Sequence, residues 1–426
     1  MKRRSLLKAA GAAGLATLVS PRQWSAMAQA ERATRGMAIP RIRDISVIET
    51  QPAGVRLTVV KITTDQDGLY GYGCATFTQR ADLVRPAVEK YLKPFLIGKT
   101  TDRIEDIWQA LYRGGFYRGG PILTSAISGI DQALWDIKGK RLGAPVYDLL
   151  GGAVRDRMRV YAWIGGDQPD ELAESARERI AAGYTALKMN ATAALEWIDT
   201  RLKIQAAADR IGVLRDAVGY GIEIGIDFHG RVHKTMAKVL AKELEQFKPM
   251  FYEEPVLPEN NEALIEIARH TSIPIATGER MFTRWDYKAL LADGVVDIIQ
   301  PDLSHAGGIW EVRKIAAMAE AYDIAVAPHC PLGPIALAAS LQLDFCTPNC
   351  FIQEQSLGIH YNQGSDLLDY LVDPDVFHYQ GGYVPRLSGP GLGIELNEAK
   401  IRAAAELGHR WRSPVWRTTD GSVTEW

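Results

Sequence analysis

The segment GIDFHGR (residues 225–231), followed by the motifs FYEEP and TGER, decides the fold that this sequence predicts. Each motif follows a short apolar run, and the first carboxylate in each is Asp227, Glu253 or Glu279. The two steps between these carboxylates are equal, at 26 residues each. A step of about one strand plus one helix, with an acid at the end of every strand, is typical of a parallel βα barrel. We therefore expect the three acids to end successive strands and to face one mouth.

Further polar side chains follow the same rhythm on both sides of this segment. They end predicted strands at Lys188 and Asn190 upstream, and at Asp302, His329 and Glu354 downstream. The step from Lys188 to Asp227 is longer, at 39 residues, which predicts an insertion or an extended helix there. Barrel enzymes place their active sites at the carboxyl ends of the strands, so these residues are candidates for one site.

Length and composition describe a large globular chain with no general affinity for polyanions. The 426 residues, 47% of them hydrophobic, are enough for more than one domain. A net charge of −2 and a pI near 6.5 give none of the basic excess that nucleic acids or acidic membranes attract. The four cysteines are scattered, with neither metal-binding spacing nor the look of a disulfide framework. An anionic substrate must therefore be bound by a local site.

The first thirty residues predict an export signal. Arg3 and Arg4 precede a stretch rich in Ala, Gly and Leu, and small residues between positions 26 and 30 offer cleavage sites. This order resembles a twin-arginine signal, so we expect residues 1–30 to be removed and the protein to be periplasmic. A membrane anchor is the weaker alternative, because the apolar run is too short to span a bilayer. The protein is cytoplasmic if the signal is not used.

The remaining chain divides into three predicted parts. Residues 38–152 begin with two β-rich runs and continue with helical patterns, which is typical of an α+β domain. Residues 153–370 hold the barrel and its site. The residues from 371 to 426 lose the periodicity and are rich in Gly, Pro and Trp, so we expect a tail that packs back on the first domain.

The three strand-end carboxylates predict a metal centre. Three acids that meet at one point repel one another unless a cation lies among them. Oxygen ligands alone suit a hard ion such as Mg²⁺ better than zinc. The alternative is that these acids are solvated loop residues or helix caps, which leaves their equal spacing unexplained.

Two of the eight histidines extend the candidate site. His229 lies two residues after Asp227, and we expect it on the same face of that strand, while His329 ends a later strand. Near a metal, such a pair is better interpreted as an acid and a base than as two structural residues. Asp302, on the strand before His329, is placed to hold that imidazole in one tautomer, with an ordinary strand-end cap as its alternative.

A family resemblance extends over nearly the whole chain after the signal, and these motifs carry it: GIDFHGR, FYEEP, TGERMF, QPDLSHAGGI, APHCPLGPIALAAS and IQEQSLGIHYN. They resemble the enolase superfamily, mandelate racemase subgroup, and within it the sugar-acid dehydratases. The resemblance implies an α/β fold, with a modified TIM barrel of seven βα units plus a final strand under an N-terminal α+β capping domain. It also implies Mg²⁺ bound by Asp227, Glu253 and Glu279.

The resemblance further implies a role for each polar side chain at the reacting carbons. His329, backed by Asp302, would remove the proton from carbon 2. His229 would protonate the departing 3-hydroxyl, since hydroxide is a poor leaving group, and Glu354 would form a hydrogen bond with the enolate.

Three further residues concern substrate binding. Lys188 and Arg231 add positive charge for an anionic sugar acid, with a solvated surface position as the alternative for Arg231. Asn190 stands where racemases of this subgroup carry the second lysine of a K-x-K motif. With a base on one side only, elimination is favoured over racemisation.

The predicted activity is therefore the Mg²⁺-dependent dehydration of D-galactonate, or a related aldonate, to a 2-keto-3-deoxy acid. Residues 71–83, which cover the site in this fold, look more like those of mannonate dehydratases, so the sugar stays open. The alternatives are a mannonate- or gluconate-type dehydratase, a sugar-acid epimerase, and a non-catalytic exported sugar-acid-binding protein. We also expect a small-molecule acid-sugar substrate, a homo-oligomer, no nucleic-acid partner and no membrane contact after signal removal.

Overall fold

The computed structural model describes residues 37–50, 57–76, 78–164, 172–355, 370–406 and 414–425. The predicted signal, residues 1–30, lies outside the described residues. The chain divides into two compact units, residues 1–40 and 41–426, and the fold below is that of the second unit. In the described ranges, no helix combines the length and the apolar character that crossing a membrane requires.

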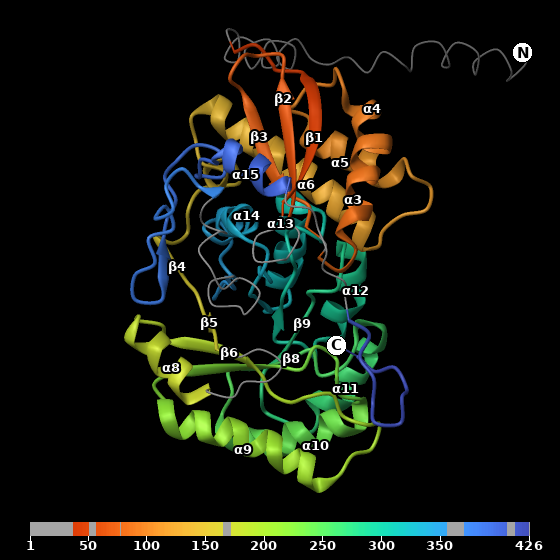
Figure 1. The fold of residues 1–426 in the computed structure, drawn as a ribbon, viewed down its shortest axis with the longest axis vertical. Helices are drawn as coiled ribbons and strands as arrows, with labels where there is room; N and C mark the ends of the chain where they lie inside the picture. The colour runs from red at the N-terminus through yellow and green to blue at the C-terminus, as the bar shows by residue number, and fades with distance from the viewer. Residues whose placement is uncertain are drawn as a thin grey trace, which may run out of the picture. The chain divides into compact units, whose positions relative to one another are not determined.

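An antiparallel sheet of three strands opens the second unit (Figure 1). In the order in which they pair, its described strands are β1 (Ile42–Thr50), β2 (Leu57–Thr64) and β3 (Tyr70–Cys74). Strand β3 packs directly on a long helix, α6. A Cβ atom added at Gly73 would lie 2.0 Å from the backbone oxygen of Gly129, so the two backbones touch with no room for a side chain.

Short helices follow this sheet and lead to α6 and the barrel. Their bounds are η2 (Thr78–Leu83), α3 (Val84–Pro86), η3 (Ala87–Leu92), α4 (Lys93–Leu96), α5 (Ile104–Arg113), α6 (Pro121–Leu142) and α7 (Val146–Leu149). Helix α6 begins with Pro121, whose fixed φ suits the first helical position, and ends at Gly143 in the left-handed conformation.

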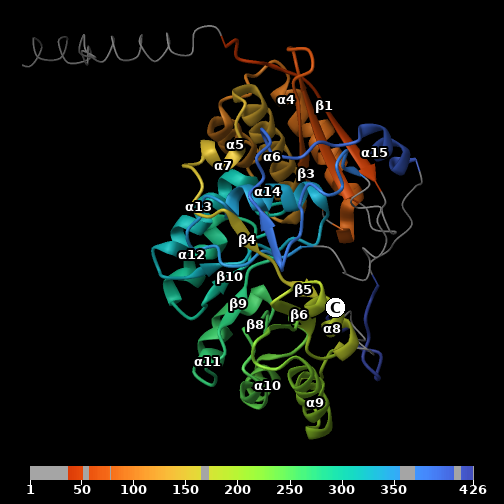
Figure 2. The same ribbon diagram turned by 90° about the vertical axis from the view of Figure 1, so that its left-hand side faces the viewer.

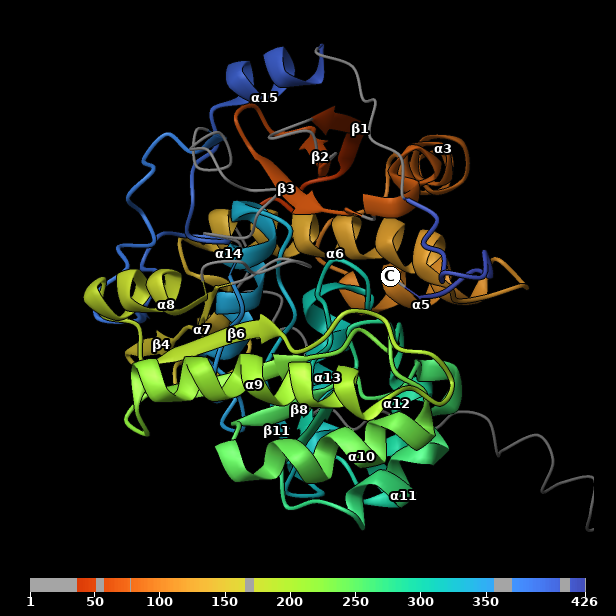
Figure 3. The same ribbon diagram turned by 60° about the horizontal axis from the view of Figure 1, so that its bottom comes forward.

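Helix α6 is buried on two sides, whereas its sequence predicts one apolar face. The apolar positions Ile127, Ile130, Leu134 and Ile137 are buried, and so are the polar positions Ser125, Ser128, Asp131 and Gln132. Figure 3 shows the reason: α6 lies between the β1–β3 sheet and α13 of the barrel. Its polar side chains therefore need hydrogen-bond partners within the protein.

The barrel is a parallel sheet whose seven described strands run in sequence order (Figure 2). They are β5 (Ala162–Trp163), β6 (Ala186–Asn190), β7 (Glu223–Asp227), β8 (Phe251–Glu253), β9 (Ile275–Thr277), β10 (Ile298–Ile299) and β11 (Ala325–Val326). Parallel bridges from Val326 to Cys350 and from Val160 to Gln353 close the sheet. The predicted fold, seven βα units and a final strand, is confirmed, and the final strand is reduced to these bridges.

Helices follow the barrel strands and surround the sheet (Figures 1 and 2). They are α8 (Leu172–Ala181), α9 (Arg201–Val218), α10 (Lys234–Leu244), η4 (Glu245–Phe247), η5 (Pro258–Ala263), α11 (Leu264–Ala268), α12 (Arg284–Asp293), α13 (Gly308–Glu320) and α14 (Pro334–Asp344). Helix α9 has 18 residues and starts at a Thr200 cap, which accounts for the long step before Asp227. Thr283 and Asp286 form a capping box at the start of α12.

The residues of the predicted tail contact both earlier parts of the chain. Strand β12 (Tyr383–Pro385) pairs with β4 (Arg157–Arg159), just before the barrel. Helix α15 (Glu398–Ala405) packs on β1, and Glu398 accepts hydrogen bonds from Lys61 and, at 2.8 Å, from the Tyr72 hydroxyl. The exact domain boundaries and the homo-oligomer stay predictions.

Candidate active site

The barrel places the first group of predicted residues side by side at its carboxyl edge. Asp227 and Glu253 are the last residues of β7 and β8 and are register partners. Asn190 ends β6 and is the partner of Asp227 on the other side, with Lys188 two residues earlier on the same strand. Glu279 follows the end of β9 by two residues. All four elements therefore deliver polar side chains to one rim.

The later barrel elements complete this rim. Asp302 follows β10, His329 follows β11, and Glu354 follows the closing bridge at Gln353. All three side chains are at least four-fifths buried. The structure therefore brings eight of the ten residues that the sequence predicts for the site to the carboxyl end of the barrel, and His229 and Arg231 follow Asp227 in the loop after β7.

Lys188 lies among the buried carboxylates. Its Nζ atom is 2.6 Å from Glu253 Oε1, 3.1 Å from Asp227 Oδ2 and 3.3 Å from Glu354 Oε1. All four side chains are almost fully buried, so their charges are poorly screened by water. The ammonium group offsets part of the negative charge of these carboxylates. The predicted role of Lys188 in substrate binding stays a prediction.

Each of the three predicted metal ligands keeps one carboxylate oxygen without a hydrogen bond. These atoms are Asp227 Oδ2, Glu253 Oε2 and Glu279 Oε2, and none makes a hydrogen bond among the described residues. Asp227 Oδ2 lies at ion-pair distance from Lys188 and His229, and Glu279 Oε2 from His329. Buried polar atoms are nearly always satisfied, so oxygens left with at most ion-pair contacts at neighbouring strand ends fit the ligands of a cation.

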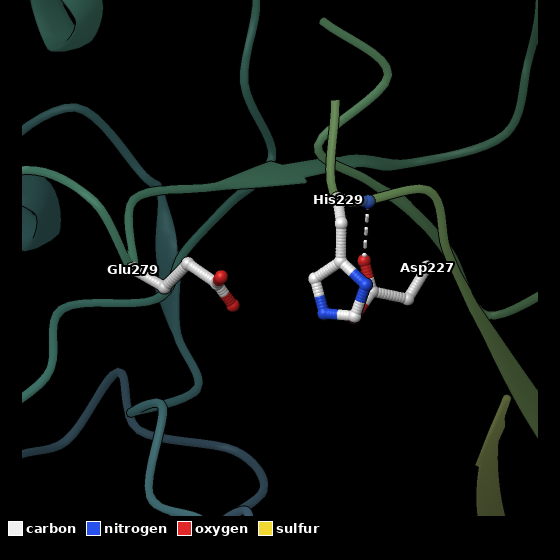
Figure 4. A group of neighbouring side chains, drawn as sticks. All are labelled: Asp227, His229 and Glu279. Carbon is white, nitrogen blue, oxygen red and sulfur yellow. Dashed lines mark hydrogen bonds and ion pairs between the residues drawn. The ribbon is translucent and has the colours of Figure 1, made fainter. Parts of the chain in front are cut away.

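The tightest group of possible ligand atoms differs slightly from the predicted one. Asp227, His229 and Glu279 each offer one atom within 4.8 Å of the others (Figure 4). Glu253 is outside this group, although it is the register partner of Asp227. For a hard ion we favour the oxygen set, because carboxylates suit Mg²⁺ and an imidazole suits zinc or copper.

Burial and mutual repulsion make these carboxylates hard to ionise. Burial, followed by the charge of Asp227, raises the pKa of Glu253 well above its usual range. Burial and the charge of Glu254 raise the pKa of Glu279 to about 8. Burial also opposes ionisation of Asp227, yet His229 and Lys188 outweigh it and lower its pKa to about 2. A cation in this group would relieve the repulsion.

His329 and Asp302 form a histidine–carboxylate pair. The Nδ1 atom of His329 is 2.7 Å from Asp302 Oδ2, and its Nε2 atom is 3.4 Å from Glu279 Oε2. Burial favours a neutral imidazole, but the charges of Glu279 and Glu354 outweigh it and raise the pKa of His329 to about 10. Contact with Asp302 fixes Nδ1 as the protonated atom and directs Nε2 toward the carboxylates.

His229 reaches the site by a different route from the one predicted. Strand β7 ends at Asp227, and His229 has a left-handed backbone with φ of 47°, so it shares no strand face with Asp227. A bond of 2.9 Å from its backbone N–H to Asp227 Oδ1 holds this turn, and Nε2 lies 3.2 Å from Asp227 Oδ2. Strained backbone of this kind is concentrated at functional sites. Burial lowers the pKa of His229 to about 4.

Arg231 is buried beside His229. Only 5% of its surface is exposed, and its Nη2 atom lies 3.3 Å from His229 Nδ1. The solvated surface position that the sequence left open is therefore wrong for this residue. Its positive charge helps to lower the pKa of His229, after burial and against the opposing charge of Asp227.

Some residues at the site are missing from the sequence-based prediction. Glu254 is fully buried, has φ of 41° and accepts two hydrogen bonds from the Arg280 guanidinium. His305 lies 3.7 Å from Asp302, the partner of His329. The doubled glutamate in FYEEP and the histidine in QPDLSHAGG are the signals from which both contacts could have been suspected.

A closed parallel barrel that gathers carboxylates, two histidines and a lysine at its strand ends defines an enzyme of the α/β-barrel class, with side chains suited to a metal ion. Comparison with known proteins narrows this class. Residues 38–151 match the family model of the mandelate racemase / muconate lactonizing enzyme N-terminal domain, and residues 171–400 match the enolase C-terminal domain-like model. The chain belongs to the mandelate racemase subgroup of the enolase superfamily.

Curated relatives match the chain over most of its length. It is 54% identical over 373 residues to D-galactonate dehydratase from Ralstonia pickettii, which covers 87% of this chain and 97% of that protein. It is 52% identical over 382 residues to D-galactonate dehydratase from Xanthomonas euvesicatoria, which covers 90% of this chain and 100% of the relative.

Solved structures show the same fold. An enolase from Pantoea ananatis with bound D-gluconate and Mg has a TM-score of 0.81 at 34% identity, covering 91% of this chain and all of that one. A dehydratase-like protein from Mesorhizobium loti has a TM-score of 0.79 at 34% identity, covering 85% of this chain and 98% of the other.

Proposed function

We propose that the protein is a Mg²⁺-dependent acid-sugar dehydratase that converts D-galactonate, or a related aldonate, to the 2-keto-3-deoxy acid and water. One observation carries the proposal: two imidazole Nε2 atoms lie against two different carboxylates of the candidate metal site. His229 Nε2 is 3.2 Å from Asp227, and His329 Nε2 is 3.4 Å from Glu279. A reaction that removes one proton and delivers another needs two such groups beside one binding point.

The chemistry of the donor set supports Mg²⁺ as the cofactor. Asp227, Glu253 and Glu279 would hold it through the oxygens that lack hydrogen bonds. When bound, the ion supplies positive charge for the substrate carboxylate, which makes the proton on the adjacent carbon more acidic. The solved relative that holds D-gluconate and Mg supports this assignment.

His329 is the proposed base for the proton on carbon 2. Asp302 holds its Nδ1–H at 2.7 Å, so Nε2 is the atom that accepts a proton. Its raised pKa results from the negative charge of Glu279 and Glu354, against the opposing effect of burial. Positive charge among these carboxylates would bring the pKa down toward the range in which a base is effective at neutral pH.

His229 is the proposed acid for the departing 3-hydroxyl, and Glu354 is the residue proposed to share a hydrogen bond with the enolate. Burial lowers the pKa of His229, so its proton is readily given up once acquired. Glu354 accepts a bond of 2.8 Å from the Cys330 backbone N–H, which holds one of its oxygens in place. Lys188, Asn190 and Arg231 remain the proposed substrate-binding residues.

The absence of a second base distinguishes dehydration from racemisation. Asn190, the register partner of Asp227, is 2% exposed and cannot accept a proton from carbon at neutral pH. Burial opposes the charge of Lys188, on the same strand, but the charges of Asp227, Glu253 and Glu354 outweigh burial, raise its pKa well above the usual range and hold it as an ammonium group. Neither residue of β6 is therefore suited to return a proton to the other face. This asymmetry supports elimination.

A screen of acid sugars tests the proposal. The purified protein is incubated with Mg²⁺ and galactonate, gluconate, mannonate and further aldonates, and the 2-keto-3-deoxy product is measured. We expect turnover of D-galactonate or a close stereoisomer, and no turnover after Mg²⁺ is removed with a chelator. Formation of an epimer would support the epimerase instead, and tight binding of a sugar acid without any product would support the binding protein.

We also propose export through the twin-arginine signal. Replacing Arg3 and Arg4 together by Lys should retain the protein in the cytoplasm, because the paired arginines are what the export machinery reads. Cell fractionation and mass spectrometry of the periplasmic form check this, with the expected mature start near Ala28 or Ala30. Periplasmic protein that still begins at Met1 would contradict the proposal.

A further inference from the structure

Helix α6 of the N-terminal part binds the barrel loop that carries Asp302. Ser128 Oγ accepts a bond of 2.9 Å from the backbone N–H of Gly307, and Gln132 Nε2 donates one of 2.9 Å to the backbone oxygen of Leu303. Both side chains are fully buried. These two contacts fix the path of the loop but do not reach the carboxylate of Asp302.

Ser125 differs because it contacts a side chain. Its Oγ atom lies 3.0 Å from Nδ1 of His305, and Nε2 of the same imidazole lies 3.7 Å from Asp302 Oδ2. That oxygen is also the one that contacts His329 Nδ1, at 2.7 Å. The other oxygen of Asp302 accepts a bond of 2.6 Å from the Ser304 backbone N–H. The carboxylate is therefore bonded to one backbone group and to the His329 imidazole, while the His305 imidazole faces it at ion-pair distance.

The position of His305 between Ser125 and Asp302 favours one tautomer of its imidazole. Burial lowers the pKa of His305 against the opposing charge of Asp302, so the ring is neutral. A neutral imidazole beside a carboxylate is more stable with its N–H facing the charge, which puts the proton on Nε2. Nδ1 then has a lone pair, and the Ser125 hydroxyl donates to it.

We propose that Ser125 and His305 are positioning residues, through which α6 orients Asp302 and thereby the imidazole of His329. The proposal rests on the proposed role of His329 as the base. Its consequence is a link between the two parts of the chain: the base is held in its working orientation by a helix that belongs to the cap.

Kinetics of the Ser125→Ala variant test this link. We expect kcat to fall roughly tenfold to a hundredfold, the range for groups that act through a metal-site or catalytic partner, with KM and Mg²⁺ affinity nearly unchanged. A substrate deuterated at carbon 2 should show a larger isotope effect than with the parent protein, because proton removal becomes slower. Ser125→Thr keeps the hydroxyl and should restore kcat.

Ser128→Ala is the matched control. Ser128 is a buried serine on the same helix and binds the same loop, but only through the backbone of Gly307. We expect a similar loss of thermal stability in both alanine variants and a loss of kcat in Ser125→Ala alone. Equal kcat in the two variants would overturn the proposal. If Ser125→Ala does not fold, Ser125→Cys keeps the volume and weakens the donor.

A spectroscopic measurement separates this proposal from the proposed function. The Nδ1 proton of His329, observed by NMR in metal-free protein with labelled histidine, should shift in Ser125→Ala and stay in place in Ser128→Ala. An unshifted signal in both variants would refute the positioning role. A parent protein that dehydrates no acid sugar would refute the proposed function, and the NMR comparison would still decide the positioning role.

Discussion

The His329→Asn variant is expected to lose both dehydration and the exchange of the carbon 2 proton with solvent deuterium. His329 is the histidine whose Nδ1 contacts Asp302 at 2.7 Å. On β6, Asn190 is not a base, and the ammonium group of Lys188 is paired with Asp227, Glu253 and Glu354. General acid–base groups are worth roughly 10² to 10⁴ in rate, so dehydration should fall by at least that factor. Exchange is measured by NMR of the recovered substrate in D₂O.

The His229→Asn variant is the counterpart that separates the two histidines. It should also lose dehydration, yet some carbon 2 proton should still exchange, because His329 and Asp302 are intact. Exchange without elimination is thus expected in this variant alone, provided the proton on His329 swaps with solvent before it returns. If exchange occurs in the His329 variant instead, the acid and the base must be interchanged; normal dehydration by both variants rejects the mechanism.

The Glu253→Gln variant is expected to lose Mg²⁺ binding and all measurable dehydration. Glu253 Oε2 has no hydrogen-bond partner among the described residues, and its neighbour on β7 is Asp227. Residues that only support a metal ligand are worth roughly 10- to 100-fold in affinity, so loss of a ligand should exceed about a hundredfold. Isothermal titration with Mg²⁺ measures this directly.

The same variant should fold as well as the metal-free parent. Burial and the charge of Asp227 raise the pKa of Glu253 well above its usual range, so ionised Glu253 is costly and a neutral amide of equal size avoids that cost. Glu311→Gln is the control, because Glu311 is equally buried but pairs with Arg284 on α12. The control should bind Mg²⁺ normally. Full Mg²⁺ affinity in Glu253→Gln would remove Glu253 from the metal site.

The barrel was predictable because its signal is local and repeated. Each strand is a short apolar run that ends in a polar residue, and the near-constant step between Asp227, Glu253 and Glu279 follows from the length of one βα unit. Convergence of these side chains then follows from topology, since parallel strands end at one edge. The long α9 was likewise visible as an extended step.

Details of the site depend on contacts that spacing does not encode. His229 was expected on the face of β7, but the strand ends at Asp227 and a left-handed turn returns the ring to the site. Arg231 is buried rather than solvated. Ser125 and His305 meet across 180 residues of sequence, and no local pattern predicts such a contact.

Because α6 is buried on two sides, it limits how the capping domain can be replaced by that of a related enzyme to change substrate preference. Gly73 and Gly129 bring β3 and α6 into backbone contact, so these two elements must be transferred together. Ser128 and Gln132 bind only backbone groups of the barrel loop, which any recipient barrel with the same loop path provides. Ser125, in contrast, contacts the side chain of His305, so this contact requires a histidine at that position of the barrel. A chimera with another residue at that position should keep its fold and its new specificity, but its kcat should be roughly tenfold to a hundredfold lower, and a histidine introduced there should restore it.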